Sequence, residues 1–179
     1  MIKIHTPLTK ELIVQLKAGD ELLLSGTIFT ARDQAHKRLA DALSQNKKPP
    51  LDLKSAVVYY CGPTATPKGK VIGSCGPTTS RRMDAFTPLL LKSGLKVMIG
   101  KGNRSEEVLQ AIKKHGAVYL VTYAGCGALL SKCVKKAKKA AYPDLGPEAI
   151  HKLEVVDFPA IVAIDARGGN IFNTNKTRR

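Results

Sequence analysis

Strand-like and helix-like segments alternate along most of this chain, and this alternation constrains its fold more than any other feature. Short apolar runs rich in β-branched residues predict strands at residues 1–5, 21–30, 55–61, 70–74, 96–99, 117–123, 153–156 and 160–165. Segments with apolar residues at helical spacing predict helices at residues 9–19, 30–45, 83–91, 105–114 and 128–141. Such alternation is typical of an α/β fold with a largely parallel sheet.

The length and composition indicate one folded unit. The chain has 179 residues, of which 44% are hydrophobic, and this is enough for one core. With five Tyr, four Phe and no Trp, that core must be mainly aliphatic. We expect a single domain over residues 1–172 and a basic, flexible tail over residues 173–179.

Targeting signals and metal motifs are both missing from the sequence. It has no run of about 18 apolar residues, and its first residues lack the apolar stretch of a signal peptide, so we expect no membrane contact and a cytoplasmic location. The four cysteines form no Cys-x-x-Cys pair, so we expect no metal ligands in this chain. Cys61 and Cys133 are interpreted as small buried hydrophobes, whereas Cys75 and Cys126 lie in glycine turns and are harder to assign.

Residues 73–84, GSCGPTTSRRMD, carry the most distinctive pattern. A predicted strand enters a Gly-Pro turn, and Thr78, Thr79 and Ser80 then precede two arginines and an apolar, helix-like segment. A helix N-terminus exposes unpaired N–H groups and a partial positive charge, so this stretch suits an anion such as a carboxylate or phosphate. Taken alone, the simpler interpretation is that Thr79 or Ser80 only caps a helix.

Arg32 begins a second segment of this kind. Thr30 and Asp33 have the spacing of a capping box, which predicts that Arg32 lies in the first turn of a helix. His36 follows one turn later and is interpreted as a supporting or surface residue.

Four residues are therefore candidates for one site, because ligands of parallel α/β proteins collect at the carboxyl ends of strands. These are Arg32, Thr78, Arg82 and Lys101, the last in a glycine turn after a predicted strand. Three cations at such an edge would suit a small dianion. Neither glycine turn, at residues 100–102 or 125–127, has the longer spacing of a phosphate-binding loop.

The chain is strongly basic, with 29 Lys and Arg against 14 Asp and Glu and a formal charge of +15. Nucleic acid, an anionic metabolite or an acidic partner could each account for this excess. A dense run of lysines, Lys132, Lys135, Lys136, Lys138 and Lys139, falls on the predicted helix at residues 128–141. Such a run is most often a solvated face, and no aromatic platform for single-stranded nucleic acid accompanies it, so a nucleic-acid-binding module is the least favoured alternative.

Three stretches resemble one enzyme family: residues 25–38 (SGTIFTARDQAHKR), 76–84 (GPTTSRRMD) and 100–103 (GKGN). They look like the C-terminal region of class I fumarases and the β subunit of two-chain fumarate or L-tartrate dehydratases. The match runs in order from about residue 6 to residue 172 and includes YAGCGA at 123–128 and VDFPA at 156–160.

The resemblance implies a swivelling β/β/α domain of three layers with a parallel central sheet. It also implies a hydro-lyase that interconverts fumarate and L-malate, with L-tartrate dehydration as the nearest alternative. Arg32, Arg82 and Lys101 match the family's substrate-binding cations, and Thr78 matches its proposed catalytic base. The family's 4Fe-4S cluster is held by cysteines of the other region or subunit, so this chain alone should be cluster-free and inactive. An α subunit is the implied partner, in a heteromer such as α2β2.

Overall fold

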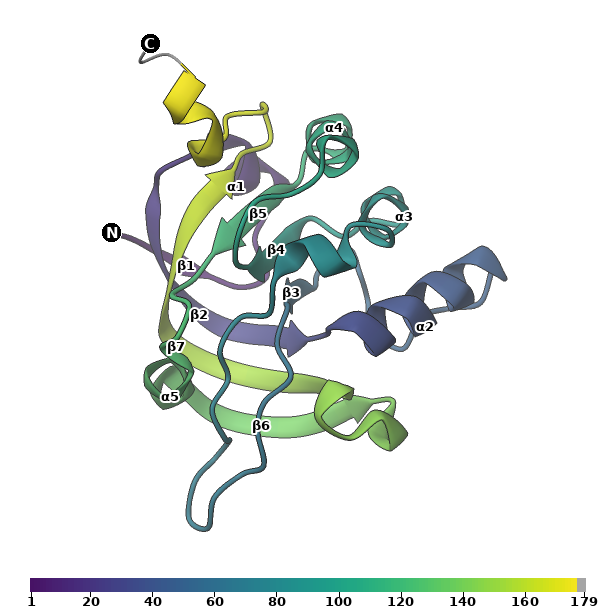
Figure 1. Ribbon diagram of the computed structural model, residues 1–179, viewed down its shortest axis with the longest axis vertical. Coiled ribbons are helices and arrows are strands. Elements are labelled where there is room, and N and C mark those ends of the chain that lie inside the picture. Colours follow the sequence, from purple (N-terminus) through teal and green to yellow (C-terminus); the bar gives the residue numbers. More distant parts are fainter. Residues whose placement is uncertain (177–179) are drawn as a thin grey trace.

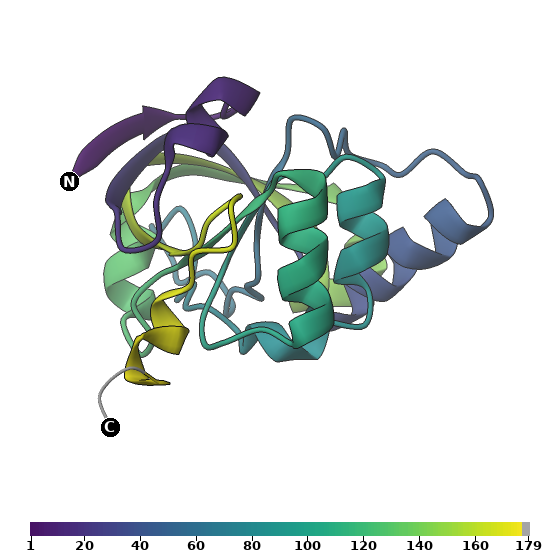
Figure 2. The same cartoon turned by 90° about the horizontal axis from the view of Figure 1, so that it is seen from above.

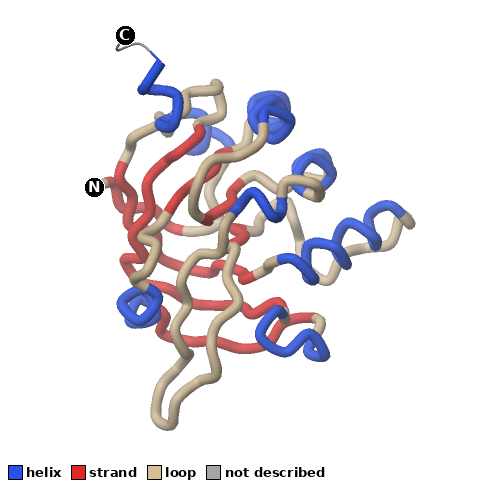
Figure 3. Tube along the Cα trace, in the orientation of Figure 1, coloured by secondary structure: helices blue, strands red, loops and turns tan. Residues whose placement is uncertain are grey.

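A seven-stranded mixed sheet organises this protein, whose computed structural model describes residues 1–176 (Figures 1 and 3). Its strands are β1 (Ile2–His5), β2 (Glu21–Thr30), β3 (Val57–Tyr59), β4 (Val97–Gly100), β5 (Val118–Val121), β6 (Val134–Ala141) and β7 (Ile150–Ile164), in the order β1-β2-β3-β4-β5-β7-β6. Neighbours from β1 to β5 pair in parallel, whereas β7 runs antiparallel to β2, β5 and β6. The predicted α/β class is confirmed, and the sheet is only partly parallel.

Strand β7 closes the sheet on itself. It pairs with β2 along most of its length and with β5 at its C-terminal end, residues 161–164, so β2, β3, β4, β5 and β7 form a ring. The prediction of two separate strands at residues 153–156 and 160–165 was wrong. The intervening residues stay in one strand because β2 remains a partner on one side throughout, while β6 and then β5 pair on the other.

Five α-helices pack around this sheet: α1 (Lys10–Gln15), α2 (Asp33–Ser44), α3 (Thr87–Lys92), α4 (Glu106–His115) and α5 (Gly127–Leu130). Short 3-10 helices cover Ser80–Met83, Ser131–Cys133, Pro143–Glu148 and Ile171–Lys176. Helices α2, α3 and α4 lie together on one side of the sheet, with α3 and α4 side by side (Figures 1 and 2). No helix among residues 1–176 combines the length and apolar character needed to cross a membrane.

The core consists of two apolar clusters on opposite faces of the sheet. Strand β3 contributes to both, because Val57 and Tyr59 point into the cluster enclosed by the ring and Val58 points toward α2, α3 and α4. Alternating side chains are thus buried on both faces, as is usual for parallel strands covered on two sides. The ends of these strands are consequently held rigidly, and the candidate residues lie there.

The lysine-rich segment differs from its prediction. Instead of a helix over residues 128–141, the chain forms the short helix α5, one 3-10 turn and strand β6, and the lysines lie on β6 or just before it. Alanine and lysine favour helices, but such local preference is weak compared with tertiary contacts, and pairing of β6 along β7 overrides it. Because β6 is an edge strand, its lysines also disfavour pairing with another chain.

The predicted strand at residues 70–74 is also absent. Residues 60–78 contain no helix or strand, and they run as a long loop that projects beyond the sheet (Figure 3). The two arms of this loop are joined through Thr64 and Ser74, where Thr64 N donates to Ser74 O at 3.0 Å. Among the described residues, no strand pairs with residues 70–74, so this short apolar run near Gly and Pro is part of the loop.

The end of the chain was expected to form a tail from residue 173. Its residues up to 176 belong to the 3-10 helix Ile171–Lys176, and residues 177–179 lie outside the described part of the chain. The single-domain boundary at residue 172 therefore stays a prediction.

Candidate active site

The carboxyl ends of three neighbouring parallel strands bring the predicted cations to one edge of the sheet. Arg32 follows β2, and Lys101 follows β4, with β3 between them. Residues Thr30, Tyr59 and Ile99 share one register across these strands, so the chain segments that follow each strand leave the sheet side by side. The expectation that strand ends would gather the site holds for these residues.

Residues 78–82 lie across this edge and are fixed there by backbone hydrogen bonds. Thr78 N donates to Tyr60 O at 2.6 Å, and Ser80 N donates to Lys101 O at 3.1 Å. The Ser80 hydroxyl is buried and accepts a hydrogen bond of 3.0 Å from Lys101 N. A Cβ at Gly100 would lie only 1.9 Å from Ser80 Oγ, so glycine is required at that position. Thr78 is therefore held beside the end of β3, two residues before Ser80, which contacts Lys101.

Arg32 occupies the N-cap position of α2, and the predicted capping box is wrong. Thr30 still belongs to β2, and its hydroxyl accepts from His151 N at 3.0 Å instead of capping a helix. The Arg32 side chain lies against Gly62, where a Cβ would come within 2.7 Å of Arg32 Cδ. The loop after β3 thus approaches Arg32 closely only because residue 62 has no side chain.

Asp33 joins the two predicted arginines. Its carboxylate lies 3.3 Å from Arg32 Nε and accepts a hydrogen bond of 2.8 Å from Arg82 Nε. The backbone and these arginines hold the pKa of the Asp33 carboxyl below its usual value, despite an opposing effect of partial burial, which is the largest single influence. Glu148 Oε1 lies 3.3 Å from Arg32 Nε on another side. Sequence reasoning missed both acids as site residues.

The two remaining candidates have free polar groups. Among residues 1–176, neither the Thr78 hydroxyl nor the Lys101 ammonium has a hydrogen-bonding partner, although both residues are partly buried. Their backbones are fixed while their functional atoms are unengaged. These two groups are therefore available to a ligand that enters beside Arg32 and Arg82.

His36 is a buried residue that supports Arg32 and not a surface residue, which is one of the two interpretations made from the sequence. It is fully buried, its Nδ1 lies 3.1 Å from Arg32 O, and its ring meets that of Tyr60 edge-on with centroids 5.0 Å apart. Burial lowers the pKa of His36 to about 4, so the ring is neutral near pH 7. A neutral ring adds no charge to the arginine cluster.

A buried ion pair supports residues 78–84 from the other side. Arg104, 3% exposed, donates from Nε to Asp84 Oδ1 at 2.7 Å and from Nη2 to the Thr87 hydroxyl at 2.8 Å. Its guanidinium lies 4.8 Å from the ring centroid of Tyr119, whose hydroxyl is 2.8 Å from Ser80 Oγ. This network was missed by sequence reasoning, although Asp84 ends the motif and Arg104 directly follows the 100–103 glycine turn.

Two of the four cysteines, Cys61 and Cys75, lie in surroundings that do not suit an iron–sulfur cluster. Cys61 and Cys75 are completely buried, and burial raises the pKa of both thiols, that of Cys75 to about 12. Cluster iron binds thiolates, which such an environment disfavours. Within residues 1–176, no three Cys, His, Asp or Glu side chains gather as a metal site would require.

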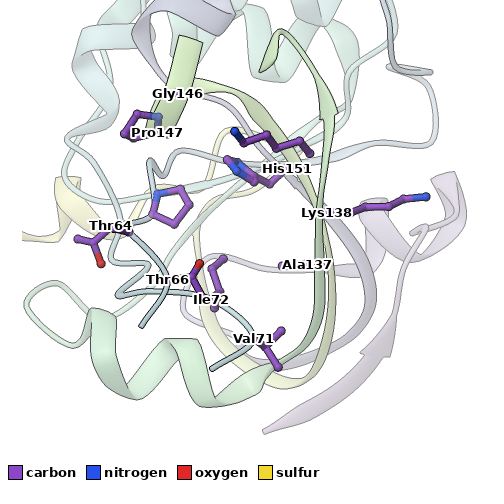
Figure 4. Close-up of a pocket in the computed structure, with 12 residues that line it drawn as sticks. Thr64, Thr66, Val71, Ile72, Ala137, Lys138, Gly146, Pro147 and His151 are labelled. Atoms are coloured by element: carbon purple, nitrogen blue, oxygen red, sulfur yellow. The ribbon is translucent and has the colours of Figure 1, made fainter. Parts of the chain in front are cut away.

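A hollow of about 460 Å³ lies beside the loop that follows β3 (Figure 4). It opens between the 63–72 segment and β6, and Thr64, Thr66, Ile72, Lys138 and His151 are among the residues that line it. None of the four predicted residues contributes to it. The candidate residues thus lie at the strand ends and do not line this hollow.

Comparison with known proteins points to one family. A family model described as Fumarase C-terminus matches residues 1–175. The chain is 42% identical over 168 residues to the anaerobic class I fumarate hydratase of Escherichia coli, an alignment that covers 91% of this chain and 31% of that protein. It is 38% identical over 166 residues to fumarate hydratase 2 of Leishmania major, covering 92% and 29% of the two chains.

A relative of similar length gives the same result. The chain is 40% identical over 171 residues to a Methanocaldococcus jannaschii protein provisionally named L(+)-tartrate dehydratase subunit beta, covering 92% of this chain and 88% of that one. It spans about a third of the length of the fumarate hydratases that it matches. The resemblance stated from the three sequence stretches is confirmed, and the chain belongs to the Fumarase C-terminus family.

Proposed function

We propose that this chain is the β subunit of a two-chain class I fumarate hydratase, which interconverts fumarate and L-malate by reversible hydration. Its family membership supports a hydro-lyase, and its 40% identity to a relative named as a subunit beta supports a separate subunit. The observation that carries the proposal is the convergence of Arg32, Arg82 and Lys101 at one edge of the sheet.

The substrate class follows from the charges of this edge. A four-carbon dicarboxylate carries two negative charges, and a guanidinium binds a carboxylate through two parallel hydrogen bonds. In the proposed site, Arg32 and Arg82 bind the carboxylates and Lys101 adds a mobile positive charge.

Thr78 is proposed to move the proton. Dehydration of malate removes a hydroxide equivalent from C2 and a proton from C3, and the Thr78 side chain, as its alkoxide, would accept that proton and become the neutral hydroxyl. A hydroxyl is a weak base, so the neighbouring cations must stabilise its charged form. The Thr78 hydroxyl has no hydrogen-bonding partner within residues 1–176, and the adjoining Thr79 and Ser80 contact Lys101, which supports this role.

The remainder of the enzyme is proposed to lie on a cytoplasmic α subunit that holds the 4Fe-4S cluster. The buried thiols of this chain support that assignment, since they do not suit a cluster. We further propose an α2β2 heteromer and a three-layer swivelling domain, in which motion of the sheet edge relative to the α subunit would open and close the site.

L-tartrate dehydration is the second candidate, because the Methanocaldococcus jannaschii relative covers a similar length. The same three cations would suit tartrate, which is also a four-carbon diacid. Nucleic-acid binding by the β6 lysines is a remote third, and the edge position of β6 accounts for those lysines in another way.

Co-expression with an α subunit that carries cluster cysteines tests these alternatives. We expect a co-purifying, oxygen-sensitive complex whose anaerobic turnover of L-malate exceeds that of L-tartrate. Higher turnover of tartrate would favour the second candidate. Nucleic-acid binding that weakens steeply with salt and persists after loss of Arg32 and Arg82 would favour the third.

A further inference from the structure

The carboxylate of Asp33 contacts Arg32 and Arg82, and in both arginines it contacts the side-chain nitrogen Nε. It lies 3.3 Å from Nε of Arg32 through one oxygen and accepts from Nε of Arg82 at 2.8 Å through the other. One acid on the first turn of α2 therefore fixes the orientation of two guanidinium planes that come from separate segments.

These contacts leave the far end of each guanidinium free. In the described residues, no hydrogen bond engages the Nη nitrogens of Arg32 or Arg82. The two Nη atoms of an arginine form an end-on fork that binds a carboxylate through two parallel hydrogen bonds. Each arginine is thus held at its Nε edge, and within residues 1–176 its Nη nitrogens remain without a hydrogen bond, although Nη1 of Arg32 lies beside Gly62.

Glu148 strengthens this arrangement at Arg32. Its Oε1 lies 3.3 Å from Arg32 Nε, and its Oε2 accepts a hydrogen bond of 2.8 Å from Gln34 N at the start of α2. Because Gly62 also presses against Arg32, this side chain is confined by three separate segments. Arg82 is held less firmly than Arg32. Its side chain is 54% exposed, and its ion pair is with Asp33 alone among the described residues.

We propose that Asp33 is a positioning residue, which holds Arg32 and Arg82 by Nε so that their Nη forks face the two carboxylates of the substrate. This inference rests on the proposed dicarboxylate substrate. Asp33 itself touches no substrate atom in this arrangement and acts through the arginines. Restriction of the two side chains before binding reduces the entropy lost when the substrate binds.

The charge of Asp33 alone and the positioning role predict opposite changes in substrate affinity when Asp33 is replaced. A carboxylate near the site repels a dianion, so if Asp33 mattered only through its charge, its neutralisation would strengthen substrate binding. If it positions the arginines, its loss weakens binding even though a negative charge has been removed. The sign of the change in affinity therefore separates the two roles.

Asp33 could also matter only to α2, because an acid in the first turn of a helix stabilises that helix. Asp33→Asn keeps the shape and one acceptor, and Asp33→Ala removes both. Asp41→Asn, on the exposed face of the same helix, is the matched control. A helix-only role would lower thermal stability without a specific change in KM for L-malate.

The test measures KM, kcat and the inhibition constant of a non-reacting dicarboxylate in the complex with the α subunit. We expect Asp33→Ala to weaken dicarboxylate binding about tenfold, Asp33→Asn to weaken it less, and Asp41→Asn to leave it unchanged. In an Arg82→Gln background, Asp33→Asn should have a smaller effect, because one of the two side chains through which Asp33 acts is gone.

Three results would overturn the inference. These are tighter dicarboxylate binding by the Asp33 variants, an equal effect of Asp33→Asn with and without Arg82, or a loss of stability with no change in binding. If Arg32→Gln and Arg82→Gln also leave dicarboxylate binding unchanged, the proposed function fails with it. If only those arginine variants lose binding, the proposed function stands and the role of Asp33 is wrong.

Discussion

Asp33 Oδ1 accepts a hydrogen bond of 2.8 Å from Arg82 Nε, although 49 residues separate the two in the sequence. This bond ties the first turn of α2 to the 3-10 turn at Ser80–Met83, so the segments after β2 and after the long 60–78 loop meet. The candidate site is therefore an assembly of separate segments, and each segment can be tested by substitution.

Substitution of Thr78 by Ala should remove the proposed proton transfer. We expect kcat of the complex to fall by a factor of about 100 to 10,000 with little change in KM, because the hydroxyl acts on the reacting proton. The exposed Thr79, one residue later, provides the control as Thr79→Ala. Steady-state kinetics would refute the role if the two variants were equally active.

The buried pair of Arg104 and Asp84 should dominate local stability. Arg104→Met leaves the Asp84 carboxylate buried without its partner, and this should lower the free energy of unfolding by about 3–5 kcal/mol. Lys152→Ala breaks a partly exposed pair with Glu154 and should cost less than about 1 kcal/mol. Denaturant titration compares them, and similar losses would contradict a structural role for the buried pair.

His36 should make stability depend on pH. Its pKa is about 4 in the folded protein, where burial disfavours the charged ring, against about 6.5 when unfolded. The unfolded chain then binds more protons between these values, so this group's contribution is complete above about pH 6.5 and is lost as the pH falls toward 4.

Replacement of His36 removes that dependence. We expect His36→Gln to reduce the slope of unfolding free energy against pH by up to about 1.4 kcal/mol per pH unit between pH 4 and 6.5. His5→Gln, at an exposed histidine, is the control. An unchanged slope, or an NMR titration of His36 with a midpoint near 6.5, would contradict the assignment.

The cysteines of this chain should not matter for the cluster. We expect Cys61→Ala, Cys75→Ala, Cys126→Ser and Cys133→Ser to leave the iron and sulfide content of the complex unchanged. Circular dichroism identifies any variant that has not folded. Loss of iron from a folded variant would show that this chain supplies a ligand.

Local signals were sufficient for parts of the fold. Helix α4 begins after Ser105, whose hydroxyl accepts from Val108 N, and ends at Gly116 in the left-handed region, as its cap and glycine predict. A run rich in β-branched and aliphatic residues predicted β2. Their structure depends mainly on residues within a few positions.

Long-range pairing explains the failures. The 134–141 segment has a composition that suits a helix, yet it is a strand because β7 offers a partner edge. For the site, the strand-end pattern predicted Arg32 and Lys101, whereas no local feature linked Asp33 to Arg82 or Glu148 to Arg32. Those contacts depend on how the sheet brings distant loops together.

The most direct test of the account is the anaerobic kcat/KM for L-malate of the complex with single Gln substitutions at its cations. We predict that Arg32→Gln, Arg82→Gln and Lys101→Gln each lower kcat/KM by a factor of about 100 or more, because each removes a charge-assisted contact to a carboxylate. Lys138→Gln, on the edge strand β6, should leave it within about twofold, as expected for an exposed charge outside the site. Equal activity of all four variants would contradict a dicarboxylate site at this edge of the sheet.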